Sequence, residues 1–497
     1  MMKKSVVILL SGLLLPLASR AETPEEFRQR LEQEYQAFSG QLKSDYESFR
    51  DKVNRQYAEA LQGKWSAVET ITPLTRPSVP DPGPVKMPEG DNPLPDTPEP
   101  VIIIEDELPR PDPQPRPRPY EPVSPSPEEY AGSFTLDFYG TPVKINMPGF
   151  RSFSTGGNSP GQLADAWRML SRSSTDNLLH SCLEARESLR LPDWYYMLMA
   201  QSVAKNLSGT DANAAVLLTG YLLSQSGFDI RFARSVGDGH LHLLFSTSGT
   251  LYGRSRYNLY GKWYYALTEP RGAVSVCEFS VPGETPLSLA MGTQPKLSYT
   301  PSPRREIDVH GHPGLKLSIA TNKNLIDLLG DYPDAALGKS EDSRWTPHAL
   351  MPLSDEIRES VIPVLRKAVE GLSQYEAVNL LLKVAQSFPY GYDSEIWGKD
   401  RVFFMDESWY YPLSDCEDHA INFVQLVREI LGLDTAFIVY PNHLSAAVAI
   451  TDGSAKGDYF ERDGKRYTGC DATYFYASAG ATAPEYRSQS AGVVRLK

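Results

Sequence analysis

The stretch Ser414-Asp415-Cys416-Glu417-Asp418-His419-Ala420 decides how this sequence is interpreted. It opens an amphipathic helix, because apolar residues recur behind it at helical spacing: Ala420, Phe423, Val424, Val427, Ile430 and Leu431. Ser414 or Asp415 can cap this helix, which places Cys416 in its first turn. Backbone N–H groups and the positive end of the helix dipole favour a thiolate there. The neighbouring carboxylates oppose the thiolate, so the thiol still needs a base.

Two later segments can supply that base and a group to orient it. His443 begins a predicted strand, and a second predicted strand, Arg466 to Cys470, returns from a hairpin and ends at Asp471. Neighbouring antiparallel strands would bring His443 and Asp471 side by side, with the helix start facing them. The sequence therefore predicts Cys416 as nucleophile, His443 as its base and Asp471 as the residue that fixes the imidazole tautomer.

This order of residues resembles the transglutaminase-like superfamily, which has a papain-like fold. The resemblance covers about residues 375–480 and rests on three motifs: Asp415-Cys416-Glu417-Asp418 at a helix start, His443 on a strand, and Asp471-Ala472-Thr473. It implies acyl chemistry through a thioester, by hydrolysis of a peptide or amide or by transfer to an amine. After His443 the sequence has Leu444-Ser445, where the family often has an aromatic residue, and this puts the wall of the acyl site in doubt.

An aromatic-rich insertion, Pro389 to Asp415, precedes the predicted nucleophile and is the natural substrate wall. Trp409, Tyr392 and Tyr410 are its candidates, and a donor from Trp409 or Tyr392 could join the Cys416 backbone N–H in an oxyanion hole. Each of these rings could instead simply be packed in the core.

Other interpretations of these residues stay open. Cys416 could be an ordinary buried cysteine, and His419 could mimic a base, although on the same helix it would more often point to solvent. No metal and no cofactor is expected, because no second cysteine pair has zinc-ligand spacing and no phosphate-binding glycine loop occurs. Cys182 and Cys277 could form a disulfide or remain buried thiols.

The chain also contains a weak internal repeat. Helix patterns, strand patterns and the hairpin Gly464-Lys465-Arg466-Tyr467 of the second half recur in the first half, where Gly261-Lys262-Trp263-Tyr264 matches the hairpin. Asp211 then stands at the position of Cys416, and Thr268 stands at the position of Asp471. The predicted fold is α+β, with two tandem transglutaminase-like units at 131–302 and 303–497, the first of them degenerate.

Three segments precede the repeat. Residues 1–21 have two lysines, a short apolar run and small residues before the predicted cleavage site, and so read as a signal peptide. Residues 22–71 predict a helical arm with an eleven-residue apolar repeat, which favours docking or self-association: Phe27, Leu31, Tyr35, Phe38, Leu42, Tyr46, Phe49, Val53 and Tyr57. Residues 72–128 read as a Pro-rich linker, an extended spacer in which Val101-Ile102-Ile103-Ile104 could dock as a short strand.

Composition excludes some partners. The formal net charge is −13, from 49 basic and 62 acidic residues, which argues against nucleic acid, since phosphate binding needs a basic surface. No later stretch is long and apolar enough for a transmembrane segment. We therefore expect an exported protein, periplasmic or extracellular, whose substrate is a protein or peptide.

The sequence leaves three functions open. The first is a thiol-dependent hydrolase, a cysteine peptidase or amidase, and it is the leading one because water is the default acceptor and no amine site is evident. The second is a protein-crosslinking acyltransferase, a transglutaminase in the strict sense. The third is a non-catalytic binding or scaffolding protein.

Overall fold

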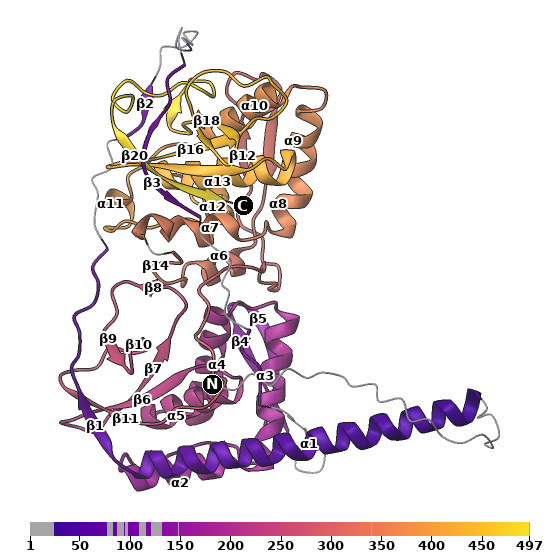
Figure 1. Ribbon diagram of the computed structural model, residues 1–497, viewed down its shortest axis with the longest axis vertical. Coiled ribbons are helices and arrows are strands. Elements are labelled where there is room, and N and C mark those ends of the chain that lie inside the picture. The colour runs from indigo at the N-terminus through magenta and orange to yellow at the C-terminus, as the bar shows by residue number, and fades with distance from the viewer. Residues whose placement is uncertain are drawn as a thin grey trace, which may run out of the picture.

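The fold is mixed α+β, as expected, and consists of two lobes with a long helix lying along the first (Figure 1). The computed structural model describes residues 24–76, 83–86, 94, 98–108, 116–120, 132–147, 149–338 and 340–496. The expected signal peptide, residues 1–21, lies outside the described residues. Among the helices that the structure describes, every one is too short or too polar to cross a membrane.

The first lobe is built on a six-stranded sheet that four helices accompany. In sheet order, its strands are β1 (Trp65–Val68), β11 (Val274–Cys277), β6 (Ile230–Ser235), β7 (Leu241–Ser246), β10 (Lys262–Ala266) and β9 (Arg256–Leu259). The helices are α2 (Pro160–Leu170), α3 (Asp176–Ser188), α4 (Asp193–Ser208) and α5 (Ala212–Gln225). Trp167, Trp194 and Tyr221 are fully buried in its core, which also includes residues from later in the chain, such as Met351 and Phe404.

The second lobe has a sheet of the same size that closes almost into a barrel. Its strands, in sheet order, are β17 (Tyr459–Arg462), β18 (Lys465–Cys470), β16 (His443–Ala449), β15 (Thr435–Tyr440), β20 (Ser490–Leu496) and β3 (Ile102–Glu107). A bridge between Pro100 and Tyr459 brings the last strand back toward the first. Helices α10 (Gln374–Gln386) and α13 (Cys416–Leu431) pack with this sheet around a second apolar core.

The two sheets have the same strand order. β11, β6, β7, β10 and β9 of the first lobe follow one another as β20, β15, β16, β18 and β17 do in the second. Helices α4 and α5 precede the first set along the chain, just as α10 and α13 precede the second. In each sheet the outermost strand next to β11 or β20 comes from the N-terminal segment. This shared topology agrees with the repeat that the sequence indicates.

Shorter elements connect these parts. They are the pairs β4 (Ser133–Phe138) with β5 (Thr141–Asn146), β12 (Arg305–Asp308) with β13 (Lys316–Ile319), β8 (Thr250–Leu251) with β14 (Ala335–Ala336), and β2 (Val85–Lys86) with β19 (Tyr474–Phe475). The connecting helices are α6 (Lys323–Leu329), α7 (Thr346–Leu350), α8 (Asp355–Ser360), α9 (Ile362–Ala368), α11 (Asp393–Ile396) and α12 (Met405–Tyr410).

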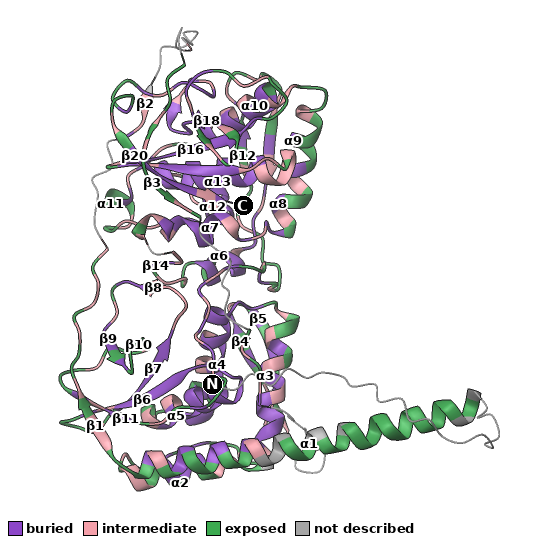
Figure 2. Ribbon diagram, viewed as in Figure 1, coloured by how far each residue is buried: buried purple, intermediate pink, exposed green. Residues whose placement is uncertain are grey.

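The predicted arm is helix α1 (Pro24–Gln62), and only its C-terminal part docks on the chain. Val53 and Tyr57 are buried, and the Tyr57 ring stacks on Trp167 of α2 with 4.2 Å between ring centroids. Toward the N-terminus the same apolar stripe is exposed, including Tyr35 at 68% and Phe38 at 65%, and this part projects from the lobe (Figure 2). The repeat that contains Val53 and Tyr57 therefore packs against the first lobe.

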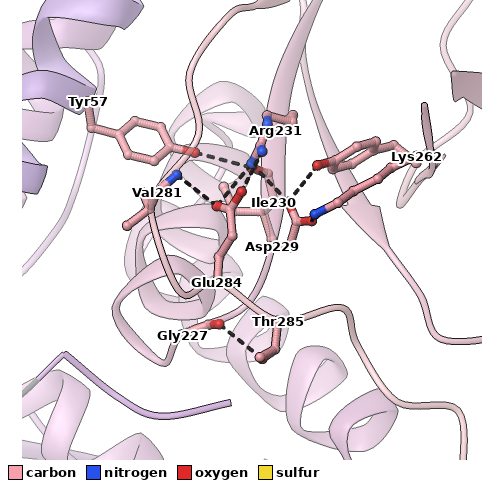
Figure 3. Close-up of polar contacts among 10 residues, drawn as sticks. Tyr57, Gly227, Asp229, Ile230, Arg231, Lys262, Val281, Glu284 and Thr285 are labelled. Atoms are coloured by element: carbon pink, nitrogen blue, oxygen red, sulfur yellow. Dashed lines mark hydrogen bonds and ion pairs between the residues drawn. The ribbon is translucent and has the colours of Figure 1, made fainter. Parts of the chain in front are cut away.

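A buried ion cluster lies where the docked helix meets the first sheet (Figure 3). Arg231 Nη1 lies 2.9 Å from Asp229 Oδ1, and Arg231 Nη2 lies 2.5 Å from Glu284 Oε1. The Tyr57 hydroxyl donates a hydrogen bond of 3.4 Å to the Ile230 carbonyl in the same region. The Tyr57 bond joins α1 to the start of β6, and the ion pair of Arg231 joins the same strand to Glu284.

Parts of the Pro-rich segment are structured and reach both lobes. Ile71 pairs with Arg256 in the first lobe, whereas β2 and β3 join the second lobe, β3 running parallel to β20. Tyr120 then returns to the first lobe, where its backbone N–H donates to the Gln225 carbonyl. The expected docking of Val101–Ile104 as a short strand is confirmed. We call residues 71–107, as far as they are described, the strap.

Candidate active site

Cys416 is the first residue of helix α13, as the sequence predicts. Asp415 caps the helix with an extended backbone, and its N–H donates to Asp418 Oδ2 over 3.4 Å. Gly432 ends the helix in a left-handed conformation, φ 65°, which suits a residue without a side chain. Cys416 is 5% exposed. The thiol thus lies beside the positive end of a helix whose apolar face is packed in the core.

His443 and Asp471 are brought together by the strands that the sequence predicts. His443 opens β16 and Asp471 follows β18, and these strands are antiparallel neighbours. His443 Nε2 lies 2.8 Å from Asp471 Oδ2, and both side chains are buried. Because Nε2 faces the carboxylate, Nδ1 is the ring nitrogen that can exchange a proton with another group.

The Asp471 carboxylate is held as an anion by its surroundings. Its other oxygen, Oδ1, accepts hydrogen bonds from the Thr473 N–H at 2.9 Å and the Tyr474 N–H at 3.1 Å. Burial alone would raise the pKa of Asp471, but the charge and hydrogen bond of His443 and the bonds from Thr473 lower it below its usual value. An ionised Asp471 can orient the imidazole and stabilise its protonated form.

A cavity of about 560 Å³ joins the thiol to the imidazole. Cys416 and His443 both line it, together with the turn Pro441–Asn442 that precedes β16. Asp471 is not part of the lining, since it lies behind the imidazole. The structure therefore gathers all three predicted residues, with the two reacting groups facing one solvent-connected space.

Carboxylates dominate the rest of the cavity wall: Glu105, Asp342, Asp393, Asp400, Asp415 and Glu417. The lining holds two full cations, Arg344 and Lys399. Glu417 is the closest to the thiol, because Cys416 Sγ donates to its Oε2 over 3.4 Å. Burial raises the pKa of Glu417 to about 8, Asp400 adds to this shift, and Arg344 and Arg76 oppose it. Burial raises the pKa of Asp393 to about 7 as well, so the cavity becomes more negative as the pH rises through 7 and 8, and above this range it attracts cations and repels anionic groups.

Arg76 of the strap compensates part of this negative charge. Its guanidinium contacts Asp400, lies 3.3 Å from Asp334, and approaches Glu417 Oε1 to 3.8 Å. The Arg76 side chain is 9% exposed. The strap also packs closely against Tyr392. Gly83 has a φ of 81°, and a Cβ on this residue would collide with the Tyr392 hydroxyl.

The three aromatic candidates occupy different places. Tyr392 lines the cavity. Trp409 is buried in the core with its ring edge-on to Phe388 at 4.9 Å, and Tyr410 packs against Tyr411. Neither Trp409 nor Tyr410 belongs to the cavity lining. Of the predicted wall, Tyr392 is the residue that the structure brings beside Cys416.

The expectation that His419 points to solvent is wrong. His419 is 2% exposed and lies among aromatic rings. The distances from its ring centroid to those of Phe388 and Tyr390 are 6.3 and 5.9 Å. Burial lowers the pKa of His419 to about 4. A neutral, enclosed imidazole is part of the core, so His443 stands as the base candidate.

The four cysteines are all free thiols, so Cys182 and Cys277 form no disulfide. Burial raises the pKa of Cys182 and of Cys277 to about 12, and it raises the pKa of Cys470 further. Within the described residues, Asp415, Cys416 and Glu417 place potential metal-ligand atoms within 4.8 Å of one another, and His443 is not part of that group.

Strap residues at the site were missed from sequence. Arg76, Ile104 and Glu105 lie more than 300 positions before Cys416, inside a segment whose composition indicates a spacer. The apolar run at Val101–Ile104 was the signal available, and it predicted a strand without its location. Comparisons with family models, with curated proteins and with solved structures found no match for this chain.

Proposed function

We propose that this protein is an exported thiol-dependent hydrolase, a cysteine peptidase or amidase, with Cys416 as nucleophile. The observation that carries the proposal is the 2.8 Å contact between His443 and Asp471, beside a cavity that His443 shares with Cys416. An ordinary buried cysteine would need neither an oriented imidazole nor an opening to solvent. We further propose that both lobes are transglutaminase-like units and that the first is degenerate.

The reaction then runs in two steps. His443 Nδ1 takes the proton of the Cys416 thiol, and the sulfur attacks the amide carbonyl of the substrate. The C–N bond breaks, the leaving amine takes the proton from His443, and an acyl thioester remains on Cys416. Water, deprotonated by His443, attacks the thioester carbonyl, so the carboxylic acid leaves and the thiol is restored.

Two features support the charge changes in these steps. Asp471 holds Nε2 of His443 and stabilises the imidazolium that forms when the thiol loses its proton. The backbone N–H of Cys416 lies at the start of α13, where it can stabilise the oxyanion of the tetrahedral intermediate. Tyr392, from the cavity wall, is the nearest candidate for a second donor.

The test is selective alkylation of the mature chain, from residue 22, by iodoacetamide near pH 7. We expect modification of Cys416 in the folded protein, because it lines the cavity, whereas the other three thiols do not line it and burial raises their pKa values. Cleavage of a peptide library, followed by mass spectrometry, should occur with the wild type and stop with Cys416→Ala. A folded protein whose Cys416 resists alkylation would exclude the hydrolase.

Transfer to an amine is the second candidate, and the carboxylate-rich wall favours it, since it would concentrate cationic amines near the thioester. A labelled diamine offered with a glutamine-bearing protein distinguishes the two. Incorporation of the label would indicate an acyltransferase, whereas release of free acid alone would indicate a hydrolase.

A further inference from the structure

Strand β3 of the strap carries an exposed apolar side chain, Ile104, at the cavity. Ile104 is 74% exposed, the most exposed large apolar side chain among the described residues. It lines the same cavity as Cys416 and His443. A single exposed isoleucine is ordinary on a protein surface, but one that lines a cavity beside a thiol is available to whatever the cavity binds.

A β-bulge places Ile104 there. In the pairing of β3 with β20, Ile103 lies opposite Ala491 and Glu105 lies opposite Gly492, so Ile104 is the extra residue between them. Bulges bend a strand and redirect a side chain, and they occur often beside active sites. Without the extra residue, strict alternation would carry the following side chains to the other face of the sheet.

Small residues of β20 leave room beside the bulge. Ser490 and Gly492 both line the cavity, and a Cβ on Gly492 would lie 3.1 Å from Asp342 Oδ2. Around this point the wall also carries the carboxylates of Glu105 and Asp342, so Ile104 is an apolar side chain in a mostly polar wall. An apolar side chain of a ligand that packs against Ile104 is sheltered from water there.

We propose that β3 forms the substrate-recognition wall of the cavity and that Ile104 is its specificity-determining residue, contacting an apolar side chain of a peptide acyl donor. This inference rests on the proposed function, because it assigns the substrate of the same thiol. The carboxylates around the rest of the wall then disfavour acidic residues elsewhere in that peptide.

Ile102 is a matched control on the same strand. It is 50% exposed and apolar, but it does not line the cavity. Ile104→Asn and Ile102→Asn therefore make the same chemical change at two exposed positions, one inside and one outside the proposed wall. Neither side chain is buried, so both variants should fold, which circular dichroism and the thermal midpoint would verify.

The experiment compares two thiol-reactive peptide electrophiles that differ in one side chain beside the reactive carbon, leucine or its near-isostere asparagine. In the wild type and in Ile102→Asn, we expect the leucine probe to modify Cys416 roughly tenfold faster than the asparagine probe. In Ile104→Asn this ratio should fall to about one. Iodoacetamide, which is too small to reach the wall, should modify Cys416 at the same rate in all three proteins.

Each outcome has a distinct meaning. Three results would overturn the role of Ile104: the leucine preference survives in Ile104→Asn, it is lost equally in Ile102→Asn, or the wild type does not show it. None of these results contradicts the proposed hydrolase. If iodoacetamide also spares Cys416 in the wild type, the proposed function fails and this inference fails with it.

Discussion

The two lobes place corresponding backbone in corresponding positions, yet among the described residues the second lobe alone has a thiol, an imidazole and a carboxylate at the three matching positions. Asp229 pairs with Lys262 in the first lobe over 3.3 Å, and Asp434 pairs with Lys465 in the second over 2.5 Å. Each aspartate also accepts a backbone bond through its carbonyl, from Ser246 in one lobe and Ala449 in the other. These landmarks align the strands residue by residue.

On this alignment the first lobe carries His240 where the second has His443, and Thr268 where it has Asp471. The His240 side chain is 61% exposed, whereas that of His443 is 3% exposed. At the helix start, Asp211 is the N-cap of α5 and accepts bonds from Ser154 and from the Thr155 N–H. The expected match of Asp211 to Cys416 is therefore wrong: Asp211 corresponds to the N-cap Asp415, and Ala212 stands where the second lobe has its thiol. The comparison shows that the shared sheet and helix supply a frame, while the chemistry depends on a few enclosed side chains.

The largest expected effect comes from removing the base. His443→Ala should slow alkylation of Cys416 near pH 7 by about a thousandfold, because a positioned base contributes 10²–10⁴-fold to proton transfer. The measurement is the second-order rate constant for iodoacetamide between pH 5 and 10. At high pH, where hydroxide deprotonates the thiol, the variant and the wild type should approach each other.

His240→Ala is the matched control for that experiment. It removes the imidazole at the corresponding position of the first lobe, where no thiol is present, so the rate profile of Cys416 should not change. Equal losses in both variants would show that the histidines act through stability rather than as bases, and would break the proposed difference between the lobes.

The next effect concerns buried charge. Arg231 is enclosed by Asp229 and Glu284 in the first lobe, and Arg76 is enclosed by Asp334, Asp400 and Glu417 beside the second. Arg231→Met leaves the buried Asp229 and Glu284 without this cation, which should lower the free energy of unfolding by about 3 kcal/mol. Arg76→Met should cost about 1 kcal/mol, because Asp334 and Asp400 are 41% and 31% exposed and water screens their charges. Urea unfolding measures the loss.

Arg28→Met, on the exposed part of α1, is the control for both and should change stability by less than about 0.5 kcal/mol. An unchanged urea midpoint for Arg76→Met would mean that the strap contacts the second lobe without stabilising it. The strap would then be a spacer at Arg76, as its composition indicates.

The elements that could be predicted from the sequence follow from local patterns, whereas the residues that could not be placed depend on contacts between distant parts of the chain. The helix from Cys416, the strand at His443 and the strand ending before Asp471 follow from apolar spacing and turn residues, and their antiparallel order brings the triad together. Burial of His419 depends on Phe388 and Tyr390, which follow α10, and on Phe475 of β19, and the pattern of one helix cannot reveal such contacts. Arg76 and Ile104 reach the site because proline-rich backbone crosses between lobes, and no periodicity encodes such a path.

Asp471 provides a smaller, pH-dependent effect. Its pKa is lowered in the folded protein, so it contributes stability above its unfolded pKa of about 3.9, and that contribution is lost as the pH falls through the folded pKa. Asp471→Asn should therefore lower stability by about 2 kcal/mol at pH 7, since it weakens charge-assisted bonds. The difference between the variant and the wild type should shrink as the pH falls below the unfolded pKa of about 3.9, and it should disappear once the pH is below the folded pKa.

Asp165→Asn controls for a general effect of charge removal, because Asp165 is 77% exposed and pairs on the surface with Arg168. Its removal should shift the midpoint slightly and without a marked pH dependence. A pH-independent loss in Asp471→Asn would point to packing, and not to the ionised carboxylate, as the source of the stability.

The smallest expected effect is the absence of activity when a thiol is placed at the matching position of the first lobe. Ala212→Cys puts a thiol at the first residue of α5, where the second lobe has Cys416 at the first residue of α13. The helix start alone should lower the thiol pKa modestly, but Ala212 is exposed and Thr268 stands where the second lobe has its orienting carboxylate. In the Cys416→Ala background, the new thiol should therefore react with iodoacetamide as an ordinary exposed cysteine and cleave no peptide. Peptide cleavage by this variant would show that the first lobe retains a working base, and the degenerate assignment would have to be withdrawn.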